Sequence, residues 1–153
     1  MREPRQILEQ VVATLPGYDE WVQQSRNVDY FEMLLCSNGT AADVFTYAHL
    51  FCPRFVEVDG CVVLADRYDP ENWSNWRETL SPEHAARMIN HTHVEDMFGS
   101  RGFHDLTKYE DEMGELLAYF WKQAVDRQFP DAGVRVWYDD GIVHTAQREA
   151  ALP

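Results

Sequence analysis

Phe55-Val56-Glu57-Val58-Asp59-Gly60-Cys61-Val62-Val63-Leu64 carries the strongest short-range structural signal in the sequence. Two runs rich in β-favouring residues flank Asp59-Gly60, a pair that tolerates the positive φ angles of a two-residue type I′ turn. The resulting register places Val58 opposite Cys61 and leaves apolar side chains on both faces of the hairpin. We therefore expect this hairpin to be covered, at least in part, on both faces.

A second Asp-Gly pair, Asp140-Gly141, stands between two further β-favouring runs near the end of the chain. Here the faces differ, because Arg135, Trp137 and His144 share one face and apolar side chains share the other. We expect an α+β fold: an antiparallel sheet built from the two hairpins, at about 54–64 and 134–146, packed with five to seven helices. The length predicts a single globular domain over residues 1–153.

Capping residues predict where two helices between the hairpins begin. Asp69-Pro70 and Ser81-Pro82 each place a capping residue before a proline at the first helical position, so short helices should begin there. We expect a loop over 97–104, followed by the longest helix, 105–128. One stripe of that helix carries Leu106, Tyr109, Met113, Leu116, Phe120 and Ala124.

The chain is strongly acidic, with a formal charge of −13 from 26 acidic and 13 basic residues. It also contains 5 Trp, 7 Tyr and 8 Phe, which favours a folded domain with an anionic surface over a disordered tail. Phosphate binding needs clustered Lys and Arg, so nucleic acid is not expected as a partner. A basic protein is the charged partner that this balance favours.

The sequence also predicts a cytoplasmic protein. Its apolar runs are shorter than a signal peptide or a membrane span requires, so no membrane association is expected. Cys36, Cys52 and Cys61 form no C-x-x-C pair and are interpreted as buried free thiols in a reducing compartment. The oligomeric state stays open.

An acidic cluster occupies the first turns of the predicted long helix. Its members are Asp105, Glu110, Asp111, Glu112 and Glu115. A solvated helix face is one interpretation. The other is a binding surface that steers a cationic protein partner toward the chain.

Trp137 is the aromatic residue that most favours a binding surface. The hairpin register places it with Arg135 and His144, and an exposed Trp beside an Arg is typical of binding hot spots. The alternative is that a helix covers this face and Trp137 belongs to the core.

The segment His91-Thr92-His93-Val94-Glu95-Asp96 has the atom types of a transition-metal site. An alternative prediction is therefore a metal-dependent enzyme that uses His91, His93 and Glu95. Histidines at i and i+2 converge on one ion only from a strand or an irregular turn, because on a helix they point apart. The main prediction includes neither metal nor cofactor.

No nucleophile elbow, phosphate-binding loop or zinc-protease signature is present in the sequence, so it supplies no catalytic residues. In charge, size and missing catalytic motifs the chain resembles bacterial immunity proteins as a broad class, although no motif of that class is matched. The resemblance implies an immunity- or antitoxin-like inhibitor of a basic protein. An accessory subunit that docks through the Trp137 face is a further alternative.

Overall fold

A computed structural model describes residues 1–24, 29–98 and 106–147 of the chain. It contains two compact units, Arg2–Leu50 and Phe51–Pro153. Helices and two small antiparallel sheets make up the fold, in agreement with the predicted α+β class. The single domain expected over 1–153 stays a prediction.

The N-terminal unit is helical. Its elements are α1 (Pro4–Val11), the 3-10 turn η1 (Val12–Thr14), α2 (Tyr18–Gln24), α3 (Tyr30–Asn38) and α4 (Ala41–Phe51). Tyr30 is the centre of this unit: it is 2% exposed and its hydroxyl donates to the Pro16 carbonyl over 2.6 Å. Its ring meets Tyr18 and Trp21 edge to face, with centroids 5.3 and 5.8 Å away. Aromatic packing of this kind holds α2 and α3 together.

The first sheet is the hairpin of β1 (Phe55–Val58) and β2 (Cys61–Leu64). The strands are antiparallel with Val58 opposite Cys61, which is the register that the sequence predicts. Asp59 and Gly60 lie between them with φ angles of 50° and 78°, as a type I′ turn requires. Every residue of β2 is at most 5% exposed, so both faces of this strand are covered.

After the 3-10 turn η2 (Ala65–Arg67) come α5 (Pro70–Arg77) and α6 (Pro82–Asn90). Both helices begin where the sequence predicts. The Asp69 carboxylate accepts a hydrogen bond from the Asn72 amide, and the Ser81 hydroxyl accepts one from the His84 amide. Against β2 the two helices form a core of Cys61, Val63, Trp73, Ala85, Ala86 and Ile89.

The second sheet has three strands in the order β3-β5-β4: β3 (Thr92–His93), β4 (Arg135–Asp139) and β5 (Ile142–Ala146). The prediction that both hairpins build one sheet is therefore wrong. In the second hairpin β5 pairs with β4 on one edge, and β3 occupies the other edge. Both hydrogen-bonding edges of β5 are thus occupied within this sheet, and the first hairpin forms a separate two-stranded sheet.

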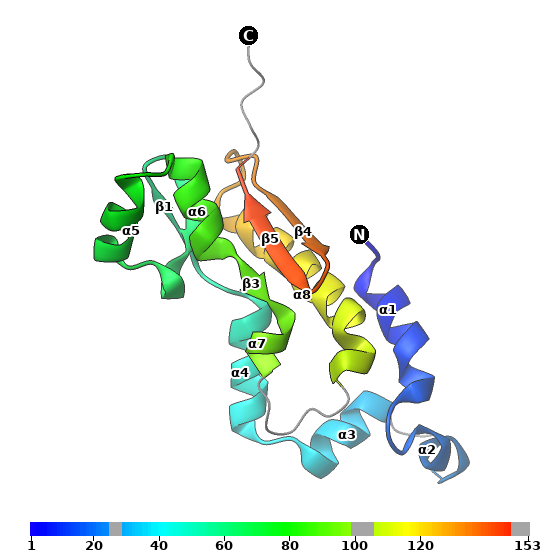
Figure 1. Cartoon of the computed structure of the whole chain (residues 1–153). Coiled ribbons are helices and arrows are strands. Elements are labelled where there is room, and N and C mark those ends of the chain that lie inside the picture. The colour runs from blue at the N-terminus through cyan, green and yellow to red at the C-terminus, as the bar shows by residue number, and fades with distance from the viewer. Residues whose placement is uncertain (25–28, 99–105, 148–153) are drawn as a thin grey trace. The chain divides into compact units, whose positions relative to one another are not determined.

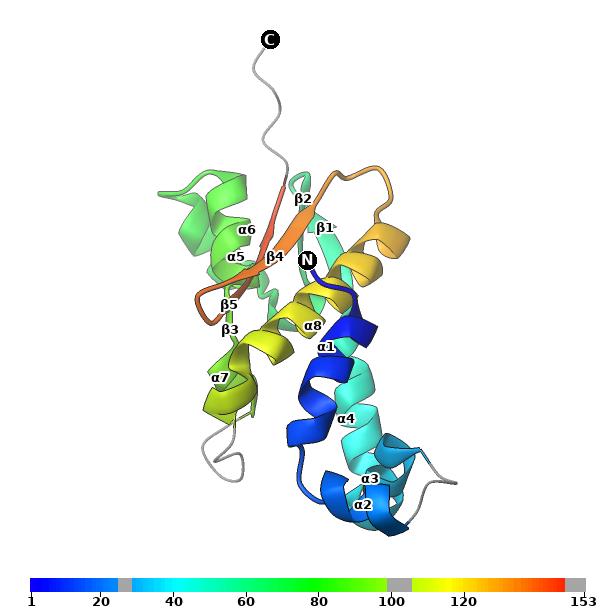
Figure 2. The same ribbon diagram turned by 90° about the vertical axis from the view of Figure 1, so that its right-hand side faces the viewer.

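Two helices lie between β3 and β4 along the chain: α7 (Val94–Phe98) and α8 (Leu106–Gln128). Figures 1 and 2 show α8 lying along one face of β4 and β5. The described residues thus form eight α-helices, against the expected five to seven. Helix α7 includes the first two residues of the loop expected over 97–104, and residues 99–105 lie outside the described part.

The buried stripe of α8 differs from the predicted one. Leu117, Ala118, Trp121 and Val125 are at most 2% exposed, whereas the predicted members Met113, Leu116 and Phe120 are only half-buried. A non-helical residue, Tyr109 (φ −122°, ψ 15°), interrupts the first turns, so one continuous 3.6-residue period does not extend to the predicted start. Among the described residues, no helix is both long and apolar enough to cross a membrane.

Candidate binding site on the Trp137 face

The side chains of Trp137 and His144 lie on the face of the second sheet that points away from α8. Successive residues of a strand alternate between faces, and the ring of the next residue, Tyr138, packs on Gly114 of α8. Trp137 and His144 are cross-strand partners. Their rings are stacked, with centroids 4.9 Å apart and an interplanar angle of 17°.

Arg135 extends this arrangement along β4. Its guanidinium carbon lies 5.3 Å from the centroid of the Trp137 ring, within the range of a cation–π contact. Arg135 is exposed and Trp137 is half-buried. Trp137 is therefore neither a fully covered core residue nor a freely exposed one.

The sheet face that carries Trp137 forms one wall of the site, and helix α6, which lies beside β5, forms the other (Figure 2). Between the helix and the sheet lie two hollows of about 520 and 410 Å³, which share His84, Arg87 and Trp137 in their linings. We call the two together the Trp137 hollow. The residues lining it are Leu80, Glu83, His84, Arg87, Met88, His91, Arg135, Trp137, His144, Thr145, Ala146 and Gln147.

The charges lining this hollow are the reverse of those of the whole chain. Arg87 and Arg135 are both exposed, and within the described residues neither forms an ion pair. Among the described residues of the lining, Glu83 is the one carboxylate, and the Ser81 hydroxyl lowers its pKa, so that it is ionised at pH 7. Two arginines against one carboxylate give the described lining a net positive charge.

His144 contributes an uncharged ring. Burial lowers the pKa of this imidazole below its ordinary value, and His91 and Arg87 act in the same direction while Asp139 opposes them. The ring stacked on Trp137 is therefore neutral at pH 7. It extends the flat aromatic surface of the hollow without adding charge.

A second group of histidines lies at the edge of the hollow. The Nε2 atoms of His91 and His93 are 3.0 Å apart, and the two rings meet at an interplanar angle of 71°. The ring of His91 also lies 6.0 Å from that of His144. We call His91 and His93 the histidine pair.

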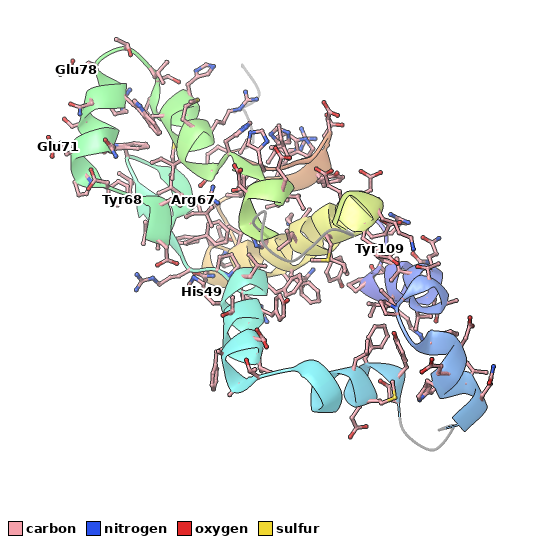
Figure 3. All side chains as sticks on the ribbon, turned by 60° about the horizontal axis from the view of Figure 1, so that its bottom comes forward. His49, Arg67, Tyr68, Glu71, Glu78 and Tyr109 are labelled. Carbon is pink, nitrogen blue, oxygen red and sulfur yellow. The ribbon has the colours of Figure 1, made fainter. Side chains whose placement is uncertain are left out.

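The backbone that carries the histidine pair is held by Arg67, which Figure 3 labels. Its guanidinium donates to the His91 carbonyl over 2.8 Å and to the Thr92 hydroxyl over 2.7 Å. Thr92 in turn donates to the Asn90 carbonyl over 3.2 Å. The segment between α6 and α7 is thus fixed by side chains as well as by its pairing with β5.

Glu95, the third ligand of the alternative metal site, is not part of this group. It lies in the first turn of α7, where the chain has changed from strand to helix. In the described part of the chain, no three or more His, Cys, Asp or Glu residues are arranged to hold a metal ion. The structure brings together two of the three predicted ligands.

The predicted acidic cluster lies on the other side of the second sheet. Glu110, Asp111, Glu112 and Glu115 belong to α8, and Asp105 lies outside the described residues. The Tyr138 hydroxyl donates to the Asp111 carboxylate over 2.8 Å. Burial and this hydrogen bond raise the pKa of Tyr138 above its ordinary value, so the phenol stays protonated. Asp111 therefore has a structural partner within the fold, and the cluster and the Trp137 hollow are separate surfaces.

His84 and Arg87 also line the hollow, although neither of them is predicted from the sequence to have a role in a binding surface. They belong to α6, three positions apart, and His91 follows four positions later. Residues at this spacing share one face of a helix. The sequence pattern that could have predicted them is the basic stripe that His84, Arg87 and His91 form on an otherwise amphipathic helix.

No protein-family model, curated protein or solved structure matches this chain. Its function is therefore inferred from the chemistry of the Trp137 hollow.

Proposed function

We propose that this chain is a protein-binding module that receives an Asp or Glu side chain of its partner in the Trp137 hollow. The observation that carries the proposal is the pair of arginines, Arg87 and Arg135, which flank Trp137 without an ion pair among the described residues. A guanidinium group binds a carboxylate through two parallel hydrogen bonds, which adds geometric selectivity to the charge attraction.

The aromatic part of the hollow supports the same proposal. Trp and Arg are the residue types most enriched at the energetic centres of protein interfaces. Here Trp137 is stacked on a neutral His144, so a flat apolar surface adjoins the two guanidinium groups. A partner segment with an apolar residue next to its carboxylate would contact both parts.

The positions of these groups are set by the fold before any partner arrives. Arg87 comes from α6, whose start is capped by Ser81, and Arg135 comes from β4, an edge strand of the second sheet that pairs with β5 along its length. Groups held on regular elements lose less conformational freedom on binding than groups on loops.

A basic partner, inhibited in the manner of immunity proteins, is a second proposal. The net charge of −13 supports it, since an anionic surface speeds encounter with a cationic protein. In that case the partner would use the acidic residues of α8 and not the Trp137 hollow. The two proposals therefore differ in the charge that the partner presents.

Selection from a random peptide library displayed on phage distinguishes them. With the wild-type chain as bait, we expect enriched peptides to carry Asp or Glu. Because one charge-assisted hydrogen bond contributes about 1.5–3 kcal/mol, a synthetic peptide of the enriched sequence should bind Arg87→Ala or Arg135→Ala about tenfold or more weakly.

Arg54→Ala is the matched control, because Arg54 is also exposed but faces Asp66 at 3.9 Å and lies outside the hollow. It should leave peptide affinity unchanged. Enrichment of Lys- and Arg-rich peptides would overturn the proposal in favour of the basic partner. Peptides that bind all three arginine variants equally, or tighter binding of a single-stranded oligonucleotide at the hollow, would also overturn it.

A further inference from the structure

We propose that the histidine pair, His91 and His93, binds one divalent transition-metal ion of the Cu²⁺ or Ni²⁺ type, with water in the remaining coordination positions. Imidazole nitrogen is a preferred ligand of both ions. The proposal does not rest on the peptide-binding function proposed above, although His91 also lines the Trp137 hollow.

The local backbone meets the condition for two histidines at i and i+2 to share an ion. His91 follows the last residue of α6 with extended angles, φ −65° and ψ 116°, and His93 belongs to β3. In extended backbone, residues i and i+2 project from the same face. The sequence gives only the i, i+2 spacing of the two histidines, and the structure shows the extended backbone that a shared ion requires.

The distance between the nitrogens decides which ions fit. Two nitrogens 3.0 Å apart, each about 2.0–2.1 Å from a shared ion, subtend an angle of about 90° at that ion. This is the angle between neighbouring ligands in the tetragonal geometry of Cu²⁺ and Ni²⁺. A tetrahedral Zn²⁺ ion would need the nitrogens to separate by a few tenths of an ångström, to about 3.3 Å.

The pair is also held in place without metal. The carbonyl of His91 and the hydroxyl of Thr92 both accept hydrogen bonds from Arg67, and Thr92 and His93 pair with β5. The ion would therefore bind to an ordered backbone and would not have to organise a loop. A hydrogen bond between the two Nε2 atoms requires a proton on one of them, and that proton must move to Nδ1, through water, before both nitrogens can bind an ion.

Titration calorimetry of the tag-free protein with NiCl₂ tests the proposal. We expect one ion for each chain, and His91→Ala and His93→Ala should each weaken binding by at least tenfold, since loss of an outer-shell partner alone costs about 10–100-fold. His49→Ala is the matched control, because His49 belongs to α4 in the other unit and is expected to have no effect.

Electron paramagnetic resonance with Cu²⁺ gives a second readout that a change in folding would not imitate. The spectrum of the wild-type protein should show nitrogen coupling from two imidazoles, reduced to one in either single variant. Ni²⁺ binding that survives in both variants, or a Cu²⁺ spectrum with no imidazole coupling, would overturn the proposal. Because no peptide is used, this outcome is independent of the result for the Trp137 hollow.

Discussion

Asn90 connects the two sheets through its side chain. It is 1% exposed, its amide oxygen accepts a hydrogen bond from the Leu64 amide over 2.9 Å, and its amide nitrogen donates to the Val62 carbonyl over 2.9 Å. The same nitrogen lies 3.4 Å from the Thr145 carbonyl of β5. One buried side chain thus links β2 to the second sheet, where no backbone ladder joins them.

Asn90→Ala should destabilise the protein by about 2–6 kcal/mol, because an unsatisfied buried backbone group costs about 1–3 kcal/mol and the Leu64 amide and the Val62 carbonyl would both be left unsatisfied. The measurement is the free energy of unfolding from urea denaturation. Asn75→Ala is the control, since Asn75 is exposed on α5 and its loss should cost no more than about 0.5 kcal/mol. Equal effects of the two substitutions would show that Asn90 does not join the sheets.

Sequence reasoning could not assign this role to Asn90. An asparagine at the end of a predicted helix is typical of a cap, and its partners lie 26, 28 and 55 positions away along the chain. The same limit applies to Trp137. Its cross-strand partner, His144, follows from the local hairpin register, but Arg87 on α6 can be brought beside it only by the tertiary fold.

At the scale of elements, α8 and β4 approach each other closely at one glycine. A Cβ atom built on Gly114 would lie 2.2 Å from two carbons of the Tyr138 ring. The fold therefore depends on the absence of a side chain at this position. The hydroxyl of Tyr138 reaches Asp111 on the same helix, which fixes the ring over the glycine.

Gly114→Ala should destabilise the protein by about 1–3 kcal/mol, because overpacking here outweighs the gain in helix propensity of about 1 kcal/mol. Thermal and urea unfolding both measure this change. Gln123→Ala, at an exposed position of the same helix, should be nearly neutral. A stabilised Gly114→Ala variant would contradict the observed packing of α8 on β4.

Local signals predicted the elements well where a few neighbouring residues decide the outcome. Asp59-Gly60 predicted the register of β1 and β2, and Asp69-Pro70 and Ser81-Pro82 predicted the starts of α5 and α6. The way in which the strands combine into sheets is not decided by neighbouring residues. The two-residue strand β3 carries no strand signal of its own, yet it occupies one edge of β5, and the first hairpin forms a separate two-stranded sheet.

At the scale of the whole molecule, net charge and local charge differ in sign. The chain has 26 acidic and 13 basic residues, and from this total the sequence predicts a basic partner. The Trp137 hollow nevertheless joins two arginines and the rings of three histidines, drawn from α6, β4, β5 and the residue after α6. The net charge of a protein affects its solubility and the long-range steering of its partners. Recognition of a partner depends instead on the few groups that line the binding site.

The central claim is that the Trp137 hollow recognises a carboxylate of the partner through Arg87 and Arg135. A double-mutant cycle measures this contact most directly. It pairs Arg135→Ala with replacement of the Asp or Glu of the selected peptide by Asn or Gln, and uses affinities from titration calorimetry. We expect a coupling energy of about 1.5 kcal/mol or more, as for close charge pairs at interfaces. If the losses of affinity are additive, with no coupling in the cycle with Arg135→Ala or in the same cycle with Arg87→Ala, the proposed contact with the carboxylate is wrong.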